Sequence, residues 1–168
     1  MKPVFTMISY GKAEREWLKK TSHYLANPPP GCLFAIGVSE PIDGLFGPVF
    51  GGDLLGMCII GRPVARALPQ DGSCGEVVRM WLAPGLPYGT ASEVLKYAAL
   101  LAEKRGIKKL FAYHERGRHT GCIYKKAGFK KDIKTKPKVD GWGSRPNRAS
   151  AQYDSTSKRR WTMELSTP

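Results

Sequence analysis

Residues 76–113 decide the fold, and they read EVVRMWLAPGLPYGTASEVLKYAALLAEKRGIKKLFAY. The first seven are apolar except for Glu76 and Arg79, so residues 76–82 form the clearest predicted strand. Alternate residues of a strand point to opposite faces. One face would therefore carry Val78, Met80 and Leu82, and the other Val77, Arg79 and Trp81. Both faces are mainly apolar, which is typical of a central strand covered on both sides.

The residues after this strand predict a turn, a long helix and a second strand. Glycine and proline are frequent in the turn, residues 83–91. Apolar residues at helical spacing then predict a helix over about 91–105, and Gly106 is placed to end it. Residues 108–113 form the next strand. The region is therefore strand, turn, helix and strand.

The rest of the chain extends this pattern within one domain. The 168 residues suit a single core and contain no linker or repeat, so residues 1–168 are predicted to be one domain. The other predicted elements are strands at 3–8, 32–38, 53–61, 129–133 and 160–165, with helices at 12–25 and 119–127. The strands at 32–38 and 53–61 are expected to be antiparallel. Residues 134–157 have no apolar period and predict a long basic loop.

The charge of the chain is large and unevenly placed. Apolar residues make up 42% of the chain and charged residues 24%, which is ordinary, but the net charge of +13 is not. Residues 116–160 hold fourteen Lys and Arg against three Asp, a net charge of +11. A basic segment on a nearly balanced body indicates a nucleic-acid partner. The alternative is a solvated basic segment without a partner.

The cysteines and the apolar segments exclude several protein classes. Cys32, Cys58, Cys74 and Cys122 have no C-x-x-C spacing, so the sequence indicates neither a zinc ribbon nor a redox pair. The N-terminus lacks the apolar region of a signal peptide. No apolar run approaches the ~20 residues that a membrane-spanning helix needs. We therefore expect a soluble, cytoplasmic protein with no membrane partner.

The turn before the long helix has the features of an anion site. A helix N-terminus presents unpaired N–H groups and the positive end of the helix dipole, which together favour a phosphate. Gly89, Thr90, Ala91 and Ser92 occupy this position, and Gly89 allows close approach of the backbone. The turn matches neither the Walker A pattern nor G-x-G-x-x-G. An ordinary strand-to-helix turn is therefore the alternative.

This order of elements, with the turn LPYGTA at residues 86–91, resembles the GNAT superfamily of acyl-CoA-dependent transferases. The turn of that family reads Gln/Arg-x-x-Gly-x-Gly/Ala, which Gly89 and Ala91 match and Leu86 does not. The resemblance implies an α+β, GNAT-like fold with a central mixed, mostly antiparallel sheet flanked by helices. In many members the tyrosine that Tyr124 matches is the general acid near the thiol leaving group. The implied cofactor is an acyl-CoA, acetyl-CoA, bound by Met80, Leu82, Gly89, Thr90, Ala91 and Ser92.

A second set of short motifs covers roughly residues 10–165. The motifs are His23-Tyr24, Gly61-Arg62-Pro63, Arg79, Ala91-Ser92, His119-x-Gly121-x-Ile123-Tyr124, Gly141-Trp142 and Arg160-Trp161. They resemble the phage Mom family, which are GNAT-fold enzymes that modify adenine in duplex DNA. The resemblance implies a carbamoylmethylation-like change of the exocyclic adenine amine, in the cytoplasm of a phage-infected or prophage-bearing bacterium. The catalytic candidates are Tyr24, Arg79, Glu115, His119 and Tyr124, with Glu115 where the family has an Asp.

Each of these candidates also has a plain structural interpretation. The guanidinium of Arg79 lies in an apolar strand and needs a carboxylate, a phosphate or a wet cleft, although a structural ion pair would also satisfy it. His23 and Tyr24 could bind a metal or move a proton, or could only contact the helix dipole and the core. His23 is the candidate metal ligand, and iron is the metal considered, with Tyr24 and His119 as further ligands. Tyr124 could also be a core residue.

Basic residues with interleaved aromatics are expected to contact DNA phosphates and bases. The candidates are Arg116, Arg118, Lys125, Lys126, Lys130, Lys131, Trp142, Arg145 and Arg148. Three functions fit the sequence: a Mom-like DNA adenine-modifying transferase, a GNAT N-acetyltransferase acting on tRNA, protein or a small-molecule amine, and a non-catalytic nucleic-acid binder on the same scaffold. The oligomeric state is open, with a homodimer among the options.

Overall fold

The computed structural model describes residues 2–19, 27–29, 31–45, 47–51, 53–134 and 158–166. The strands are β1 (Val4–Ile8), β2 (Phe34–Ser39), β3 (Pro41–Gly44), β4 (Gly47–Phe50), β5 (Gly56–Gly61), β6 (Cys74–Leu82), β7 (Lys109–Glu115), β8 (Lys130–Lys134) and β9 (Lys158–Glu164). The helices are α1 (Tyr10–Lys19), α2 (Thr90–Glu103) and α3 (Cys122–Ala127). Within these ranges, no helix has the length and apolar character needed to cross a membrane.

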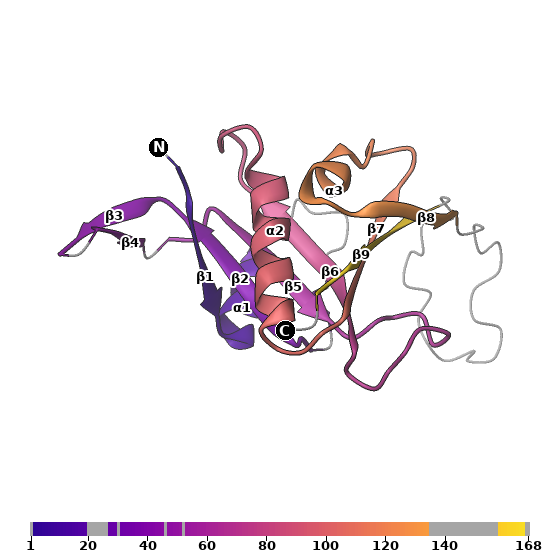
Figure 1. Ribbon diagram of the computed structural model, residues 1–168. Coiled ribbons are helices and arrows are strands. Elements are labelled where there is room, and N and C mark those ends of the chain that lie inside the picture. The colour runs from indigo at the N-terminus through magenta and orange to yellow at the C-terminus, as the bar shows by residue number, and fades with distance from the viewer. Residues whose placement is uncertain are drawn as a thin grey trace.

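Seven strands form one sheet in the order β1-β2-β5-β6-β7-β9-β8, and β3 pairs with β4 in a separate hairpin (Figure 1). Within the described ranges, β6–β7 is the one parallel pair of the large sheet. A parallel pair needs a crossover connection, and α2 supplies it. The predicted class, an α+β fold with a mixed, mostly antiparallel sheet flanked by helices, is confirmed.

Hydrophobic clusters cover the sheet from both sides, with α2 lying across its front in Figure 1. On the α2 side, helix residues such as Leu95 and Tyr124 pack against Leu110 and Trp161. On the other side, Trp17 of α1 packs against the sheet. These clusters fix both helix layers relative to the strands.

Part of the sheet has one face that α2 and α3 do not cover. In β7 and β9, Leu110 and Trp161 point into the α2-side cluster. The alternating residues Phe111 and Arg160 therefore point to the opposite side. We call this side of β6, β7, β9 and β8 the open face.

A β-bulge in β6 changes the faces predicted for this strand. The partners along β5 pass directly from Arg79 to Val77, so Val78 is the extra residue. Val77 packs on the α2 side and Val78 packs on the α1 side. The predicted faces are therefore wrong at Val77 and Val78, because strict alternation fails across a bulge.

β6 and β7 stay paired over only a short stretch, which ends at Val77 and Ala112. Beyond this point β6 continues to Leu82 against β5, while β7 continues to Glu115 against β9. The two strands therefore part, and we call this place the split. The turn that follows Leu82 leads directly into α2.

Two other predictions differ from the structure. Residues 41–50 lie between the predicted strands at 32–38 and 53–61, where no element was predicted, and they form the β3–β4 hairpin, which projects from the sheet (Figure 1). The helix expected from residue 119 begins at Cys122, because Gly121 is its N-cap in a left-handed conformation. A glycine adopts this left-handed conformation easily, so the helix begins after Gly121 and not at the polar residues before it.

Two predicted segments extend beyond the described residues. Of the helix predicted over 12–25, α1 is described as far as Lys19. The predicted loop 134–157 starts after Lys134, the last residue of β8, and residues 135–157 lie outside the described residues.

Gly121 provides a test of how tightly α3 packs against the sheet. Its φ is 76°, and a Cβ at this position would lie 2.6 Å from both His114 Cε1 and Trp161 Cζ2. We predict that Gly121→Ala lowers the free energy of unfolding by about 2–4 kcal/mol, because left-handed strain and overpacking add. Urea unfolding measures the loss. Gly117→Ala is the control, since a Cβ there meets nothing within 4 Å; equal losses in both variants would contradict the prediction.

Candidate functional site

A cavity of about 250 Å³ lies at the N-terminus of α2, next to the split. Its walls are Leu82, Ala83, Gly85, Leu86, Pro87, Tyr88, Gly89, Thr90, Ala91, Ser92, Cys122, Ile123 and Lys126. The end of β6, the turn, the first turn of α2 and the start of α3 therefore meet here. Of the predicted cofactor-binding residues, Met80 is the one outside these walls, and it packs against the α2-side cluster instead.

The turn holds the N-terminus of α2 toward this cavity. Gly89 is the N-cap with a φ of 96°, and no side chain of the described residues caps the helix. The hydroxyl of Thr90 donates to the carbonyl of Pro87 at 2.7 Å, and that of Ser92 donates to the carbonyl of Gly89 at 2.8 Å. Both hydroxyls brace the turn and do not cap the N–H groups. The positive end of the helix dipole is therefore available to an anion.

Lys126 adds a full positive charge to the cavity wall. Its Nζ lies 4.0 Å from the centroid of the Tyr88 ring and donates to the Tyr88 hydroxyl. This contact joins α3 to the turn before α2. The cavity therefore combines a helix N-terminus, a lysine and the apolar side chains of Leu82 and Ile123.

Tyr124 brings a hydroxyl to the split. Its ring is buried against Trp161 and Phe129, and its Oη donates to the carbonyl of Tyr113 at 3.3 Å. Tyr113 is the first residue of β7 beyond the last pair with β6. Tyr124 is thus both a core residue and a proton-bearing group beside the split.

Glu76 is a buried carboxyl group that the sequence analysis did not select. It lies in β6 opposite Phe111, one position before the split, and is 6% exposed. Its Oε2 accepts a hydrogen bond from the backbone N–H of Val64 at 2.8 Å. Burial raises the pKa of Glu76 to about 7, against opposing effects of the Val64 hydrogen bond, Lys158 and Arg79. A lone carboxyl in an apolar strand is the sequence signal that would have identified it.

Arg79 lies at the bulge and binds backbone carbonyl groups. Its Nη1 donates to Val78 O at 2.7 Å, and its Nε and Nη2 donate to Asn27 O at 3.2 Å. Its guanidinium also lies 6.0 Å from the ring centroid of Trp17. Arg79 therefore links the segment after α1 to β6 at the split.

Glu115 and His119 lie at the far end of β7. Glu115 is 2% exposed, and its Oε2 lies 2.9 Å from Arg118 Nε as an ion pair without hydrogen-bond geometry. His119 is exposed in the following turn, and its backbone N–H donates to Glu115 O at 3.1 Å. Neither residue lines the cavity at α2.

The buried histidine of this region is His114, which sequence reasoning did not select as a site residue. Its Nδ1 accepts a hydrogen bond from Trp161 Nε1 at 2.7 Å, and its ring stacks on Tyr124. Burial, with nearby positive charges, lowers the pKa of His114. His114 is therefore a neutral residue that fixes Trp161 and Tyr124 in place.

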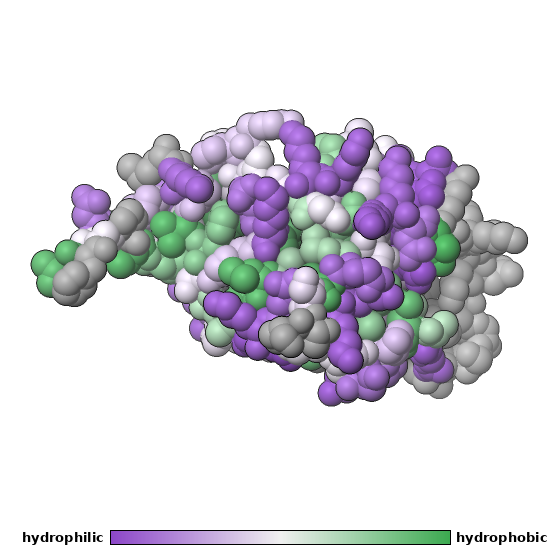
Figure 2. Space-filling view, viewed as in Figure 1, coloured by the Kyte–Doolittle hydropathy of each residue, from purple (hydrophilic) through white to green (hydrophobic). Residues whose placement is uncertain are grey.

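The predicted nucleic-acid contacts are exposed where they are described. Figure 2 shows hydrophilic side chains gathered over α3 and β8. The exposed cations are Arg116, Arg118, Lys125, Lys126, Lys130 and Lys131. The remaining nucleic-acid candidates, Trp142, Arg145 and Arg148, lie outside the described residues. The metal candidate His23 and the catalytic candidate Tyr24 also lie outside them.

A metal site was considered around His23, Tyr24 and His119. In the part of the chain that the structure describes, no group of three or more His, Cys, Asp and Glu residues could hold a metal ion. The described residues therefore give no support to iron.

Comparison with known proteins identifies the fold. No family model and no curated protein matches the sequence. An IAA acetyltransferase from Bacillus cereus has a TM-score of 0.65 at 16% identity, over 98% of this chain and 100% of that one. The ribosomal-protein-S18-alanine N-acetyltransferase from Escherichia coli gives 0.61 at 12% identity, over 99% and 96%.

A third similar structure contains a bound ligand. It is a GNAT family acetyltransferase from Elizabethkingia anophelis with acetyl-CoA bound, and it gives a TM-score of 0.57 at 16% identity, over 98% of this chain and 99% of that one. The chain therefore has the GNAT fold. At these identities the likeness shows the fold alone.

The burial of Glu76 predicts a specific dependence of stability on pH. In the folded protein the carboxyl has a pKa of about 7, above its ordinary value of 4.5. The folded state therefore holds more protons between pH 4.5 and 7, and stability falls as pH rises through this window. As pH rises from 4.5 to 7, we expect the free energy of unfolding of Glu76→Gln to increase relative to that of wild type by up to about 3 kcal/mol.

Urea unfolding at several pH values measures this gain. Glu103→Gln is the matched control, because Glu103 accepts a hydrogen bond near the surface from the backbone N–H of Ser166. A Glu76→Gln difference that stays constant with pH would show that Glu76 is ionised throughout.

Proposed function

We propose that this protein is an acyl-CoA-dependent transferase whose acceptor is an amine of DNA, specifically the exocyclic amine of adenine. The observation that carries the proposal is the cavity at the N-terminus of α2, which lies at the end of β6, the strand that also carries the buried carboxyl of Glu76 before the split. The GNAT fold of the solved acetyltransferases supports acyl transfer as the reaction class.

The residues of the cavity fit coenzyme A. Its pyrophosphate suits the N-terminus of α2 and the nearby Lys126, since both attract an anion. The apolar walls at Leu82, Leu86 and Ile123 suit the pantetheine arm. When bound, an acyl-CoA supplies an activated thioester.

Glu76 is the proposed general base. An amine that is acylated must lose a proton, and a base works best when its pKa is near the working pH. The pKa of Glu76, about 7, meets this condition. Its place one residue before the split puts the carboxyl close to where the strands open.

Tyr124 is the proposed general acid. Its Oη bears a proton and lies at the carbonyl of Tyr113, on the β7 side of the split. A thiol leaving group needs a proton, and a buried tyrosine hydroxyl can deliver one. Arg79 would be a positioning residue, because its hydrogen bonds to Asn27 O hold this segment against β6.

The choice of DNA rests on charge and on short motifs. A net charge of +11 over residues 116–160 is not needed for a small-molecule amine, whereas a polynucleotide requires it. The resemblance of the motifs to the Mom family selects adenine. Transfer from acetyl-CoA to its amine gives an N-acetyl adenine and free coenzyme A, and the carbamoylmethyl group of that family, which is joined through a CH2 group, requires steps beyond this acyl transfer. The adenine amine is a poor nucleophile, so the site must orient it, with the base turned out of the helix.

The alternative acceptor is an amine of tRNA, protein or a small molecule. The charge favours tRNA among these. The structural neighbours are named for different acceptors, so the fold does not choose between them.

Cofactor binding is tested by adding one charge to the cavity. Ala91 lies in the first turn of α2 and lines the cavity. We predict that Ala91→Glu weakens acetyl-CoA binding about tenfold or more, because the carboxylate repels the phosphates. The helix should remain stable, since a negative charge suits a helix N-terminus.

Isothermal titration calorimetry measures the affinity, with Ala91→Gln as the uncharged control of the same shape. Equal affinity in the two variants would place the cofactor elsewhere. Wild-type protein that gives no heat with acetyl-CoA would favour a non-catalytic nucleic-acid binder.

The reaction is tested by mass spectrometry of nucleosides. DNA or tRNA is incubated with the protein and acetyl-CoA, or isolated from cells that express the protein, and then digested. We expect modified deoxyadenosine with wild type and at least a hundredfold less with Glu76→Gln, since removal of a general base typically costs 10²–10⁴ in rate. The control Glu103→Gln should retain activity. Modification of tRNA alone would replace DNA by the alternative acceptor.

A further inference from the structure

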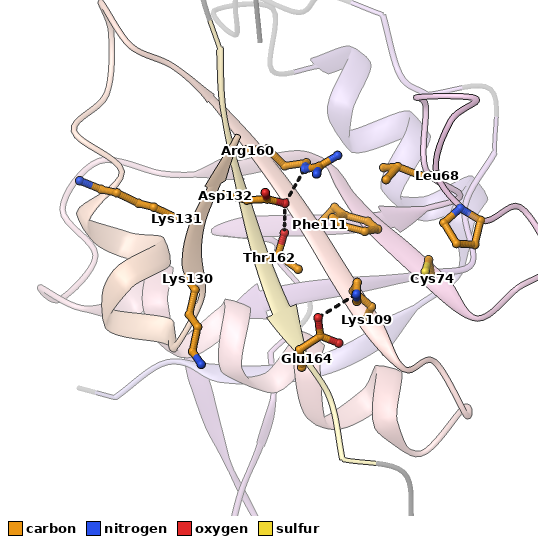
Figure 3. Close-up of a pocket in the computed structure, with 11 residues that line it drawn as sticks. Leu68, Cys74, Lys109, Phe111, Lys130, Lys131, Asp132, Arg160, Thr162 and Glu164 are labelled. Atoms are coloured by element: carbon orange, nitrogen blue, oxygen red, sulfur yellow. Dashed lines mark hydrogen bonds and ion pairs between the residues drawn. The ribbon is translucent and has the colours of Figure 1, made fainter. Parts of the chain in front are cut away.

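A second cavity, of about 430 Å³, lies on the open face. Its walls are Leu68, Pro69, Cys74, Lys109, Phe111, Lys130, Lys131, Asp132, Arg160, Thr162 and Glu164 (Figure 3). They come from the four neighbouring strands β6, β7, β9 and β8 and from the loop before β6. This cavity is larger than the one at α2 and plays no part in the proposed cofactor site.

Hydrogen bonds fix the polar side chains at its centre. Asp132 accepts from Arg160 Nε at 2.7 Å and from Thr162 Oγ1 at 2.8 Å. Figure 3 shows these three side chains turned toward one another near Phe111. The hydrogen bond from Arg160 holds the pKa of Asp132 below its ordinary value, so the pair stays charged. The guanidinium is therefore held in one orientation before any ligand arrives.

The cavity carries an excess of positive charge. Four cations, at Lys109, Lys130, Lys131 and Arg160, stand against the carboxylates of Asp132 and Glu164. Each carboxylate already has its own cation, because Glu164 pairs with Lys109 at 2.8 Å as Asp132 does with Arg160. In the described ranges, neither of the remaining two lysines has a carboxylate within ion-pair distance. Lys131 is the direct partner of Trp161 across β8 and β9, and its Nζ lies 5.8 Å from the centroid of that ring, so its charge lies toward the α2 side. Lys130 is the partner of Thr162 and, among the described residues that line the cavity, is the unpaired cation on the open face. The remaining excess of positive charge favours an anionic ligand.

The cavity lies on the same side of the sheet as Glu76. Cys74, which lines it, is two residues before Glu76 in β6, so both side chains point to one face. Phe111, another wall, is the direct partner of Glu76 across β6 and β7. Arg160 is the direct partner of Tyr113 and also donates to its hydroxyl. A ligand in this cavity is therefore next to the proposed general base.

We propose that the open-face cavity binds a backbone phosphate of the acceptor DNA and so positions the neighbouring nucleotide at Glu76. This inference rests on the proposed function, and it adds where the acceptor lies. The DNA approaches from the open face, across the sheet from the cofactor cavity. Lys130 contacts the phosphate, while Asp132 keeps Arg160 and the cavity wall in position. The cations beyond Glu115, such as Arg116, serve attraction at longer range.

Binding of a 30-base-pair duplex, followed by fluorescence anisotropy over a range of salt concentrations, tests this position. The variant is Lys130→Gln. We expect weaker binding by about threefold or more, and a slope of log K against log salt that is smaller by about 0.9, since each phosphate contact contributes about 0.9. The affinity for acetyl-CoA should not change.

The control variant is Lys131→Gln, which removes the same charge from the neighbouring residue, whose side chain lies on the α2 side of β8. If both variants weaken binding equally, only net charge matters and the cavity is not a site. If Arg116→Gln with Lys125→Gln abolishes binding while the open-face variant binds normally, the DNA lies on the α3 side. Either result overturns the inference and leaves the proposed function intact. Wild type that binds acetyl-CoA but no duplex overturns both the inference and the DNA acceptor.

Discussion

The parting of β6 and β7 is the constraint on which the rest of the structure depends. The two strands are paired only up to Val77 and Ala112, and each then keeps its other neighbour, β5 or β9. The sheet therefore opens between β6 and β7, while each of these strands stays hydrogen-bonded to its other neighbour. The bulge at Val78 bends β6 at this point, and its carbonyl accepts a hydrogen bond from Arg79. Backbone polar groups that a neighbouring strand would bind are thus satisfied by a side chain or left for a ligand.

Two buried polar groups near the split have opposite needs, and they lie on opposite faces of the sheet. Glu76 is penalised by burial, which raises its pKa to about 7, and one backbone hydrogen bond from Val64 opposes this only in part. His114 is buried as well, but its Nδ1 is satisfied by Trp161 and its neutral form is favoured. The histidine is a stable part of the core, whereas the carboxyl keeps an ionisation that is costly for folding. Such a cost is expected where a group takes part in chemistry.

The sequence predicts the elements well where local rules apply and fails where partners come from afar. As predicted, Gly106 follows the end of α2 in a left-handed conformation. The apolar residues of 76–82 correctly identify β6. The bulge at Val78 has no local signal, because it depends on how β5 pairs with β6. His119 is polar in sequence and exposed in the structure, while His114 is the histidine that touches Trp161. Contacts across 47 residues of chain cannot be read from spacing alone.

Charge acts at two ranges in this molecule, and the two have different consequences. At physiological ionic strength an exposed charge is felt over about 8 Å, so every exposed lysine adds to the attraction of a polyanion. Such attraction carries no information about which nucleotide is presented. Position requires cations that are fixed and close to the reacting group, as Arg160 is through Asp132. Under the proposed function, many basic residues can therefore gather DNA, but only fixed cations on the open face can set which base reaches Glu76.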